Sequence, residues 1–429
     1  MATRNRYLYR ISPNLSEIKQ ALTMELLEHG HVTSPEGFSA GIARCGIKPA
    51  GQPDLMLLTS ERDCTAAGMF TRNQVVGAAV TLNRQTLAIN DSRIRAIATN
   101  AGIANVCTGA QGMKNAQRMQ SLAATDLRCE TRQVMVLSTG VIGVQLPMEQ
   151  IRAGLKAAAA DAHPDGGLSA ARAIMTTDTH PKHLAARINL PSGTVTIGAM
   201  VKGSGMIHPN MATMLAFLTT DALMPATTLR ALLKSAIDQS FNCITIDGDT
   251  STSDSVLLLA NGASGVSCAR GKSREAFAAA LTILTTKLAQ MMVRDGEGVK
   301  KFVTIRVSGA RTQSDSHRVA NTIATSLLVK TAFAGSDPNW GRIIAAAGRA
   351  GVRFDLERTA LWIGASMSDT LQLMRRGAPC DYHESDAAQI FAGSNFIVHL
   401  DLGCGQAETT VWTGDLTHDY VKINADYRS

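Results

Sequence analysis

The chain has 429 residues, of which 45% are hydrophobic, 18% charged and 4% aromatic, with a formal net charge of +7. This length can bury a large core in two domains or in one large α/β unit, and the composition excludes a disordered or repeat protein. The basic residues are dispersed, without a stripe of interleaved aromatics, so we expect no nucleic-acid partner and a weak preference for anionic substrates.

Cysteine usage and the lack of long apolar runs further restrict the class of protein and its cellular compartment. The eight cysteines lie far apart and none forms a CxxC motif, so we expect free thiols in a reducing compartment, with neither a metal site nor a disulfide framework. No stretch approaches the roughly 18–20 apolar residues of a membrane span. The sequence thus predicts a cytoplasmic protein that does not associate with membranes.

The N-terminal part divides into a predicted helix and a series of predicted strands. Residues 13–30 carry helix signals, with Asn14 as the N-cap and Gly30 as the stop. We expect residues 1–36 to form an appendage before the main fold. Up to about residue 145, β-rich runs alternate with Gly/Asn turns. The expected strands include Leu55–Ser60, Ala96–Asn100 and Val134–Ser138.

Helix patterns become clearer after residue 147. Apolar residues spaced by three and four predict helices over 147–160, 229–237 and 277–288, whereas residues 164–168 predict a loop. Further strands are expected at Ser255–Ala260, Val303–Val307 and Val398–Leu402. Mixed segments of this kind predict an α/β (α+β layered) fold.

The most unusual stretch is Lys202–Leu215, with the sequence KGSGMIHPNMATML. Turn-forming residues lie here between two strand-like runs, which predicts a tightly shaped loop, although composition alone also allows a plain hairpin connection. The small Ala212 lets the Thr213 hydroxyl fold back onto the preceding carbonyl, as an N-to-O acyl shift requires. Cleavage would free this hydroxyl beside an α-amine, whose reference pKa of about 8 lets it accept the hydroxyl proton.

Further motifs accompany this stretch in a fixed order, from about residue 37 to the C-terminus. Together with Lys202–Leu215 they resemble the ornithine acetyltransferase family, also called glutamate N-acetyltransferase, of the arginine biosynthesis bifunctional protein type. Chance accounts for one such motif but not for eight in register. The motifs are Gly37–Gly41, Asn100–Asn105, Ser138–Gly143, Met175–Thr179, Asp247–Asp254, Arg294–Gly298, Asp337–Arg342 and Tyr420–Ser429.

The resemblance implies roles for individual residues. Thr213 corresponds to the nucleophile that cleavage of the Ala212–Thr213 bond exposes. Thr139 and Gly140 correspond to the side-chain and backbone donors of an oxyanion hole, which stabilises the tetrahedral acyl intermediate. The positions that match the family's substrate-binding residues are Thr176 or Thr177, Lys202, Thr213, Glu297, Asn424 and Ser429.

The sequence adds detail at Glu297, at Ser429 and at the pair Thr176 and Thr177. The glycines beside Glu297 allow close approach of a ligand, and its carboxylate suits the ammonium group of ornithine. Ser429 departs from the threonine that ends many members of the family, but it keeps a hydroxyl. The choice between Thr176 and Thr177 stays open, because the two would point to opposite faces of a strand.

The resemblance also implies an activity and an assembly. The enzyme would move the acetyl group of N-acetylornithine to glutamate through an ester on Thr213, without a metal or a bound cofactor, and acetyl-CoA as a second donor stays open. An α chain of residues 1–212 (with its main body at 37–212) and a β chain of residues 213–429 would form one fold with sheets packed between helices. The expected assembly is an α2β2 heterotetramer.

Two other functions stay open from the sequence. An N-terminal-nucleophile aminopeptidase or amidase would use the same fold, with water instead of glutamate resolving the acyl-enzyme. A non-catalytic binding protein would keep its chain uncleaved. We expect His208 to pack the loop rather than act as a base. The Asp247–Asp254 segment lacks the glutamate that a calcium loop needs at its twelfth position.

Overall fold

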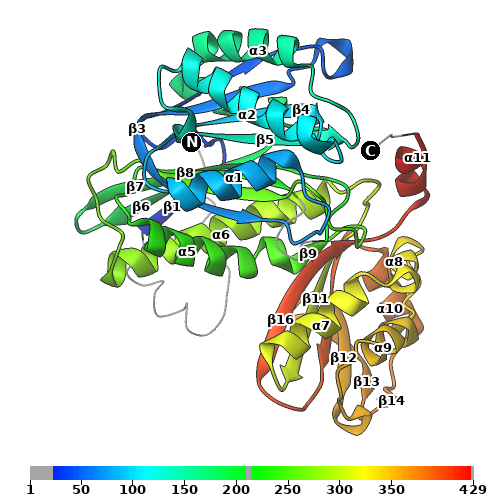
Figure 1. Cartoon of the computed structure of the whole chain (residues 1–429). Helices are drawn as coiled ribbons and strands as arrows, with labels where there is room; N and C mark the ends of the chain where they lie inside the picture. Colours follow the sequence, from blue (N-terminus) through cyan, green and yellow to red (C-terminus); the bar gives the residue numbers. More distant parts are fainter. Residues whose placement is uncertain (1–22, 209–213, 427–429) are drawn as a thin grey trace, which may run out of the picture.

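The computed structural model describes residues 23–208 and 214–426, which form two lobes, each built on its own sheet (Figure 1). The first sheet has nine strands in the order β1-β6-β7-β8-β10-β3-β4-β5, with β2 paired to β3. These strands are β1 (Thr23–Leu27), β2 (Phe38–Ala43), β3 (Leu55–Phe70), β4 (Ile94–Ile103), β5 (Val134–Val141), β6 (Lys182–Leu190), β7 (Gly193–Lys202), β8 (Leu215–Thr220) and β10 (Ser255–Ala260).

The long strand β3 joins two halves of this sheet. Its residues 65–70 pair with β10, and residues 55–60 pair with β2. The two halves stack face to face, because one buried cluster takes Met56 and Leu137 from the β2–β5 half and Phe217 and Leu257 from the other half. Since strand side chains alternate between faces, the outer face of each half needs its own cover.

Helices cover these outer faces and complete four layers (Figure 1). α1 (Ala78–Ile89), α2 (Gly109–Asp126) and α3 (Met148–Asp161) cover the β2–β5 half. α5 (Ala226–Asp238) and α6 (Gly271–Arg294) cover the other half. The helix α4 (Gly167–Ala173) packs against the cluster between the two halves. The resulting order is helix, sheet, sheet, helix, which buries both faces of the central strands β8 and β10.

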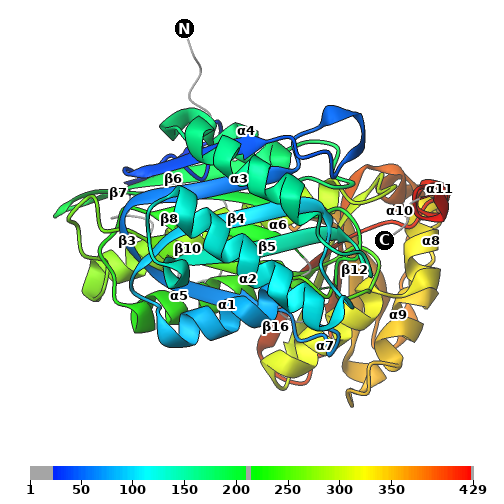
Figure 2. The ribbon, with the colours of Figure 1, turned by 45° about the horizontal axis from the view of Figure 1, so that its top comes forward.

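The second lobe has a seven-stranded sheet in the order β14-β13-β12-β15-β11-β16-β9, with its own core. Its strands are β9 (Ile244–Thr245), β11 (Phe302–Ala310), β12 (Ala360–Ser366), β13 (Asp369–Arg375), β14 (Ala378–Pro379), β15 (Asn395–Asp401) and β16 (Ala407–Gly414). The remaining helices are α7 (Gln313–Ala324), α8 (Leu327–Ala334), α9 (Trp340–Gly348), α10 (Glu384–Ala392) and α11 (His418–Asp426). α11 and α8 lie on the same side of the molecule in both views (Figure 2), with α11 nearer the first lobe in Figure 1.

Short 3-10 helices connect some of these elements. They span Pro49–Gly51, Thr131–Gln133, Pro164–Gly166, Phe241–Cys243 and Leu356–Arg358.

Most of the predicted elements are confirmed, as is the α/β class. The helices expected after residue 147 and around residues 229 and 277 are α3, α5 and α6. The strand expected at Ser255–Ala260 is β10. Those expected at Leu55–Ser60, Ala96–Asn100, Val134–Ser138 and Val303–Val307 lie within β3, β4, β5 and β11, and the one expected at Val398–Leu402 lies within β15 except for Leu402.

The helix predicted over residues 13–30 is wrong where it can be compared. Thr23–Leu27 is strand β1, which pairs antiparallel with β6, and the rest of that prediction up to residue 22 lies outside the described residues. Met24 and Leu26 pack against the core while Glu25 between them is exposed, which is the alternation of an edge strand. With Val32 fully buried, part of the expected appendage contributes to the sheet and the core.

The loop predicted at residues 164–168 is also wrong, because this stretch is helical. Pro164–Gly166 is a 3-10 turn that runs into α4. A Cβ at Gly166 would lie 1.9 Å from the carbonyl oxygen of Ala40. This glycine therefore serves close packing against β2 rather than a loop.

α6 is the described helix whose composition most resembles a membrane span, although polar residues interrupt its apolar run. By length and composition this helix could cross a membrane, and it is the one such helix within residues 23–208 and 214–426. Its residues Phe277, Leu281, Leu284 and Leu288 are fully buried in the core cluster of the first lobe. α6 is therefore a core helix whose apolar residues serve internal packing.

Candidate active site

One pocket in the first lobe brings together all the predicted site residues that the structure describes. They come from β5, the loop after α4, the end of β7, the loop after α6, and α11: Thr139, Gly140, Thr176, Thr177, Lys202, Glu297 and Asn424. Ala212, Thr213 and Ser429 lie outside the described residues. Met214, which follows Thr213 in the chain, lines the same pocket.

The expected oxyanion donors lie at the end of β5, next to β4. Gly140 is paired with Gly102 of β4 and has a φ of 128°, which side-chain-bearing residues rarely adopt. A Cβ at Gly140 would lie 2.2 Å from the carbonyl carbon of Gly102. One position earlier, Thr139 is 9% exposed. A strand end in a sheet with both faces covered holds both groups more rigidly than a free loop would.

Lys202 is the last residue of β7 and is 9% exposed. Burial lowers the pKa of its ammonium group, while the nearby carboxylates of Asp178 and Glu297 favour the charged form. A lysine this buried needs partners of opposite charge. The site therefore offers one cation to a carboxylate-bearing substrate.

Glu297 supplies an anion to the same pocket and is 8% exposed. Its backbone N–H donates to the carbonyl oxygen of Ser204 at 2.8 Å, and its Oε2 accepts a hydrogen bond from Asn424 Nδ2 at 2.8 Å. A Cβ at Gly205 would lie 2.4 Å from the Glu297 carboxylate, so only a glycine lets this carboxylate lie against the backbone. A cation and an anion in one pocket suit a zwitterionic amino acid.

Thr176 and Thr177 lie in the bend between α4 and β6, and the expectation that they belong to a strand is wrong. Both line the pocket instead of pointing to opposite faces. Thr177 Oγ1 lies 2.7 Å from Ser204 Oγ, within hydrogen-bond distance. The backbone N–H of Thr176 donates to Asp178 Oδ2 at 3.0 Å.

Residues 251–254 are pocket residues that sequence reasoning missed. They belong to the motif Asp247–Asp254, for which the sequence predicts no role in the site. Within that motif, Asp247 accepts hydrogen bonds from the backbone N–H groups of Met206 (2.6 Å) and Ile207 (2.8 Å). Met206 has a φ of 55° and lies at the start of the loop that leads to Thr213. The available signal was a run of Asp, Ser and Thr directly before a buried strand.

Other chemistry-bearing groups have structural surroundings. His208 Nδ1 lies 3.1 Å from Thr245 Oγ1, and burial lowers the pKa of the imidazole. All eight cysteines fall within the described residues and are free thiols. In the described part of the chain, no group of three or more His, Cys, Asp and Glu side chains could hold a metal ion.

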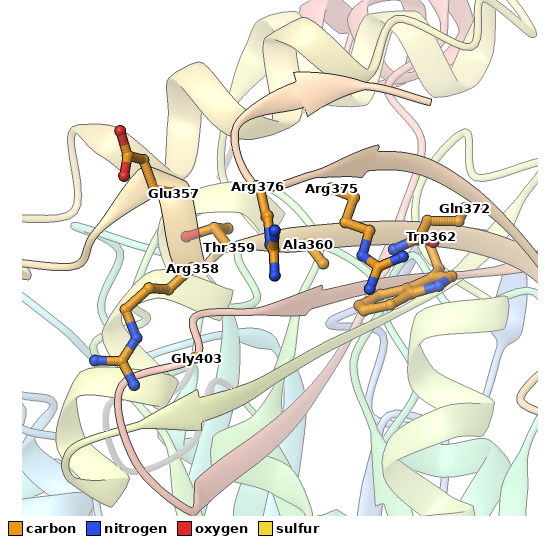
Figure 3. A pocket seen from close by; sticks show the side chains of 9 residues that line it. All are labelled: Glu357, Arg358, Thr359, Ala360, Trp362, Gln372, Arg375, Arg376 and Gly403. Carbon is orange, nitrogen blue, oxygen red and sulfur yellow. The ribbon is translucent and has the colours of Figure 1, made fainter. Parts of the chain in front are cut away.

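A second pocket lies on β12 and β13 in the second lobe and contains none of the predicted site residues. Three arginines line it: Arg358, Arg375 and Arg376. Figure 3 shows the Arg375 side chain directed toward Trp362, whereas Arg358 points away from them. This hollow lacks the combination of a hydroxyl, a buried cation and a buried anion that marks the first pocket.

Comparison with known proteins agrees with the order of the motifs. The ArgJ family model matches residues 39–429. The chain belongs to the ArgJ family. The ArgJ-type resemblance seen in the sequence is thereby confirmed.

Individual ArgJ relatives cover nearly the whole chain. The arginine biosynthesis bifunctional protein ArgJ of Symbiobacterium thermophilum is 49% identical over 404 residues, which are 93% of this chain and 99% of the relative. The protein of the same name from a Synechococcus species is 44% identical over 409 residues, 93% of this chain and 97% of the relative. A solved ornithine acetyltransferase from Mycobacterium tuberculosis, complexed with ornithine, is 38% identical, with a TM-score of 0.41, covering 44% of this chain and all of that chain.

Proposed function

We propose that this ArgJ-family chain is an acyltransferase of arginine biosynthesis that moves the acetyl group of N-acetylornithine to glutamate, with Thr213 as the nucleophile. One observation carries the proposal: a single pocket, lined by Met214 beside Thr213, contains Thr139, Lys202 and Glu297. An oxyanion donor, a cation and an anion around a nucleophile are the parts that acyl transfer between amino acids requires.

Self-cleavage of the Ala212–Thr213 bond creates the nucleophile in this proposal. The Thr213 hydroxyl attacks the preceding carbonyl, and hydrolysis of the resulting ester leaves Thr213 with a free α-amine. This amine then serves as the base for its own hydroxyl, because its reference pKa of about 8 leaves a share of it neutral near pH 7–8. The chemistry requires neither a metal nor an organic cofactor.

The acetyl transfer proceeds in two half-reactions. The Thr213 hydroxyl attacks the acetyl carbonyl while its α-amine accepts the proton, and Thr139 and the Gly140 N–H stabilise the oxyanion. The tetrahedral intermediate expels ornithine, whose amine takes up that proton, and the acetyl group remains as an ester. The amine of glutamate then attacks this ester, and the Thr213 α-amine takes a proton from it. That proton passes to the departing threonine oxygen, and N-acetylglutamate leaves.

Substrate recognition follows from the charges of the pocket. Both donor and acceptor carry an α-carboxylate that Lys202 binds, and the Glu297 carboxylate binds the side-chain ammonium group of ornithine. Asn424 orients Glu297 through their hydrogen bond. Thr176 and Thr177 both remain substrate-binding candidates. The Ser429 hydroxyl completes the site from the C-terminal end of the chain.

The proposal includes the setting of the enzyme. The α chain (1–212) and the β chain (213–429) assemble as an α2β2 heterotetramer in the cytoplasm. Acetyl-CoA serves as a second acetyl donor if the enzyme is bifunctional, as the relatives' names state for those proteins. An assay of glutamate with acetyl-CoA and no N-acetylornithine tests this extension, and no N-acetylglutamate under these conditions rejects it.

The deciding experiment incubates the purified protein with N-acetylornithine, with and without glutamate. We expect N-acetylglutamate and ornithine only when glutamate is present. Release of acetate without glutamate would indicate an aminopeptidase or amidase instead. Thr213→Ala should stay a single chain near 45.4 kDa on a denaturing gel and be inactive. Two fragments from this variant, or an uncleaved active wild-type protein, would contradict the proposal.

A further inference from the structure

A buried ion network lies directly behind the pocket lining and consists of Lys182, Asp178 and Asp295; we call it the Lys182 network. The side chains of Lys182 and Asp178 are fully buried and that of Asp295 is 1% exposed. The Lys182 ammonium group lies 2.6 Å from Asp178 Oδ1 and also pairs with Asp295 Oδ2. Burying three charges costs several kcal/mol per ion, which pairing only partly offsets. Apolar packing would fill this space at lower cost, so the charges indicate a second purpose.

Asp178 accepts hydrogen bonds from two segments that line the pocket. Its Oδ1 accepts the backbone N–H of Gly203 at 2.7 Å, directly after Lys202. Its Oδ2 accepts the backbone N–H of Thr176 at 3.0 Å. These two bonds fix the end of β7 relative to the loop that carries Thr176 and Thr177.

Asp295 holds a third segment, the loop after α6, which carries Glu297 two residues later. It accepts hydrogen bonds from the Thr179 backbone N–H at 3.2 Å and from the Thr179 hydroxyl. His180 Nδ1 lies 3.2 Å from Asp295 Oδ1. Lys182, placed between the two aspartates, therefore joins the Glu297 loop to the segments that Asp178 holds.

We infer that Lys182 is a positioning residue for the proposed acetyl transfer, and that its two ion pairs set the spacing of Lys202, Glu297 and the Thr176–Thr177 loop around the amino-acid substrate. The inference rests on the proposed function. The substrate carries its carboxylate and ammonium groups at a limited range of separations. A shift of either partner lengthens the charge-assisted hydrogen bonds to the substrate and weakens its binding.

The charge balance gives a second reason for this role. Without the Lys182 charge, Asp178 and Asp295 leave excess negative charge next to Lys202. Asp178 would then compete with the substrate carboxylate for the Lys202 ammonium group. Loss of Lys182 should therefore weaken substrate binding although Lys182 does not line the pocket.

The test compares Lys182→Met with wild type in the full chain, with rates normalised to the cleaved fraction on denaturing gels. At saturating glutamate, KM for N-acetylornithine should rise about 10- to 100-fold, while kcat stays within about threefold because the reacting groups are unchanged. Lys182→Arg keeps the charge and should recover most of the wild-type KM.

Lys301→Met is the matched control for losing a buried lysine. Lys301 is 8% exposed and its Nζ donates to Ser336 Oγ and to the Phe391 carbonyl oxygen, both at 2.6 Å, in the second lobe. This variant should lower Tm and leave KM at the wild-type value. If Lys182→Met also lowers only Tm, the network is structural and the inference is overturned.

A second variant keeps the inference testable if Lys182→Met does not fold. Asp295→Asn is isosteric and can still accept a hydrogen bond from Thr179, but it removes the ion pair with Lys182. It should raise KM in the same way, and an unchanged KM in this variant overturns the inference. A wild-type protein without acetyl transfer rejects the proposed function itself, whereas an active wild type with unaffected variants rejects only the role of Lys182.

Discussion

Gly205 and Glu297 depend on each other in the pocket. A Cβ at position 205 would lie 2.4 Å from the carboxylate carbon and from both carboxylate oxygens. Gly205→Ala should therefore displace Glu297 and raise KM for N-acetylornithine about 10- to 100-fold, with a smaller change in kcat. Gly348→Ala is the control, since nothing lies within 4 Å of a Cβ there, and it should behave as wild type in steady-state kinetics. A wild-type KM for Gly205→Ala would show that Glu297 does not bind the substrate.

Asp178 makes the stability of the fold depend on pH in a definite direction. Burial alone would raise the pKa of its carboxyl, but the charges of Lys202 and Lys182, with hydrogen bonds to the carboxylate, lower the pKa from 3.8 to about 2. A carboxyl with a pKa lowered in the folded state stabilises the fold above its unfolded-state pKa. This contribution is lost as pH falls from about 4 toward 2.

The pH effect can be measured by urea unfolding of wild type and Asp178→Asn. At pH 7 the variant should unfold with a free energy about 3 kcal/mol lower, because a buried ion pair is broken and Lys182 keeps only its pair with Asp295. This difference in free energy of unfolding should shrink as pH falls below about 4, since the wild-type carboxyl then becomes protonated. If the difference in free energy of unfolding between the two proteins stays constant down to pH 2.5, the effect comes from packing rather than from charge.

Among the elements, α11 is attached to the fold mainly by polar contacts. None of its residues is buried, and Val421 is 64% exposed. The segment is held by the Asn424–Glu297 hydrogen bond, by the exposed Lys300–Asp419 ion pair, and by the Thr417 hydroxyl, which donates to the Gly298 carbonyl oxygen. Such contacts each stabilise a fold by about 1 kcal/mol or less.

Deletion of residues 418–429 should therefore lower the activity far more than the stability. Tm should fall by only a few degrees, because little apolar surface is lost. Activity should drop at least tenfold, since the pocket loses Asn424, which lines it and bonds to Glu297. Asn424→Ala alone should reproduce part of this loss. Full activity of the truncated protein would show that α11 is not part of the site.

The strength of the local pattern explains which elements could be predicted. In α5, Leu229, Leu233 and Ile237 all face the core at helical spacing, so one turn after another repeats the same signal. β1 has only five residues, and its strand character comes from pairing with β6, far away in the chain. No local window contains that partner, and the cap signals within residues 13–30 by themselves favour a helix.

The site was predictable to the extent that its residues belong to motifs. Motif order identified Lys202 and Glu297, and topology then brought them into one pocket. The Lys182 network could not be found in this way, because lysine and aspartate are usually exposed and only the fold shows that these are buried. The sequence does not single out Ser253 and its neighbours as site residues, because short polar residues before a strand also indicate a turn.

At the scale of the whole molecule, the proposed cleavage does not separate two domains. The bond at 212–213 lies between β7 and β8, which are neighbours in one sheet and pair from Ile197↔Thr220 to Lys202↔Leu215. The two fragments would share one core, in which α6 of the second fragment packs against β6 and β7 of the first. Two chains cut at this point remain one folding unit.

The cleaved protein should therefore elute as one species in native size-exclusion chromatography and separate into its fragments only under denaturing conditions. Expressed alone, residues 1–212 lack β8, β10, α5 and α6, so β6 and β7 would expose apolar faces that are buried in the whole chain. Because a sheet face without cover cannot offset the loss of chain entropy, this fragment should be insoluble or unfolded by circular dichroism. Co-expression with residues 213–429 should restore a soluble complex. A 1–212 fragment that melts cooperatively by itself would show that the first lobe divides at the cleavage site after all.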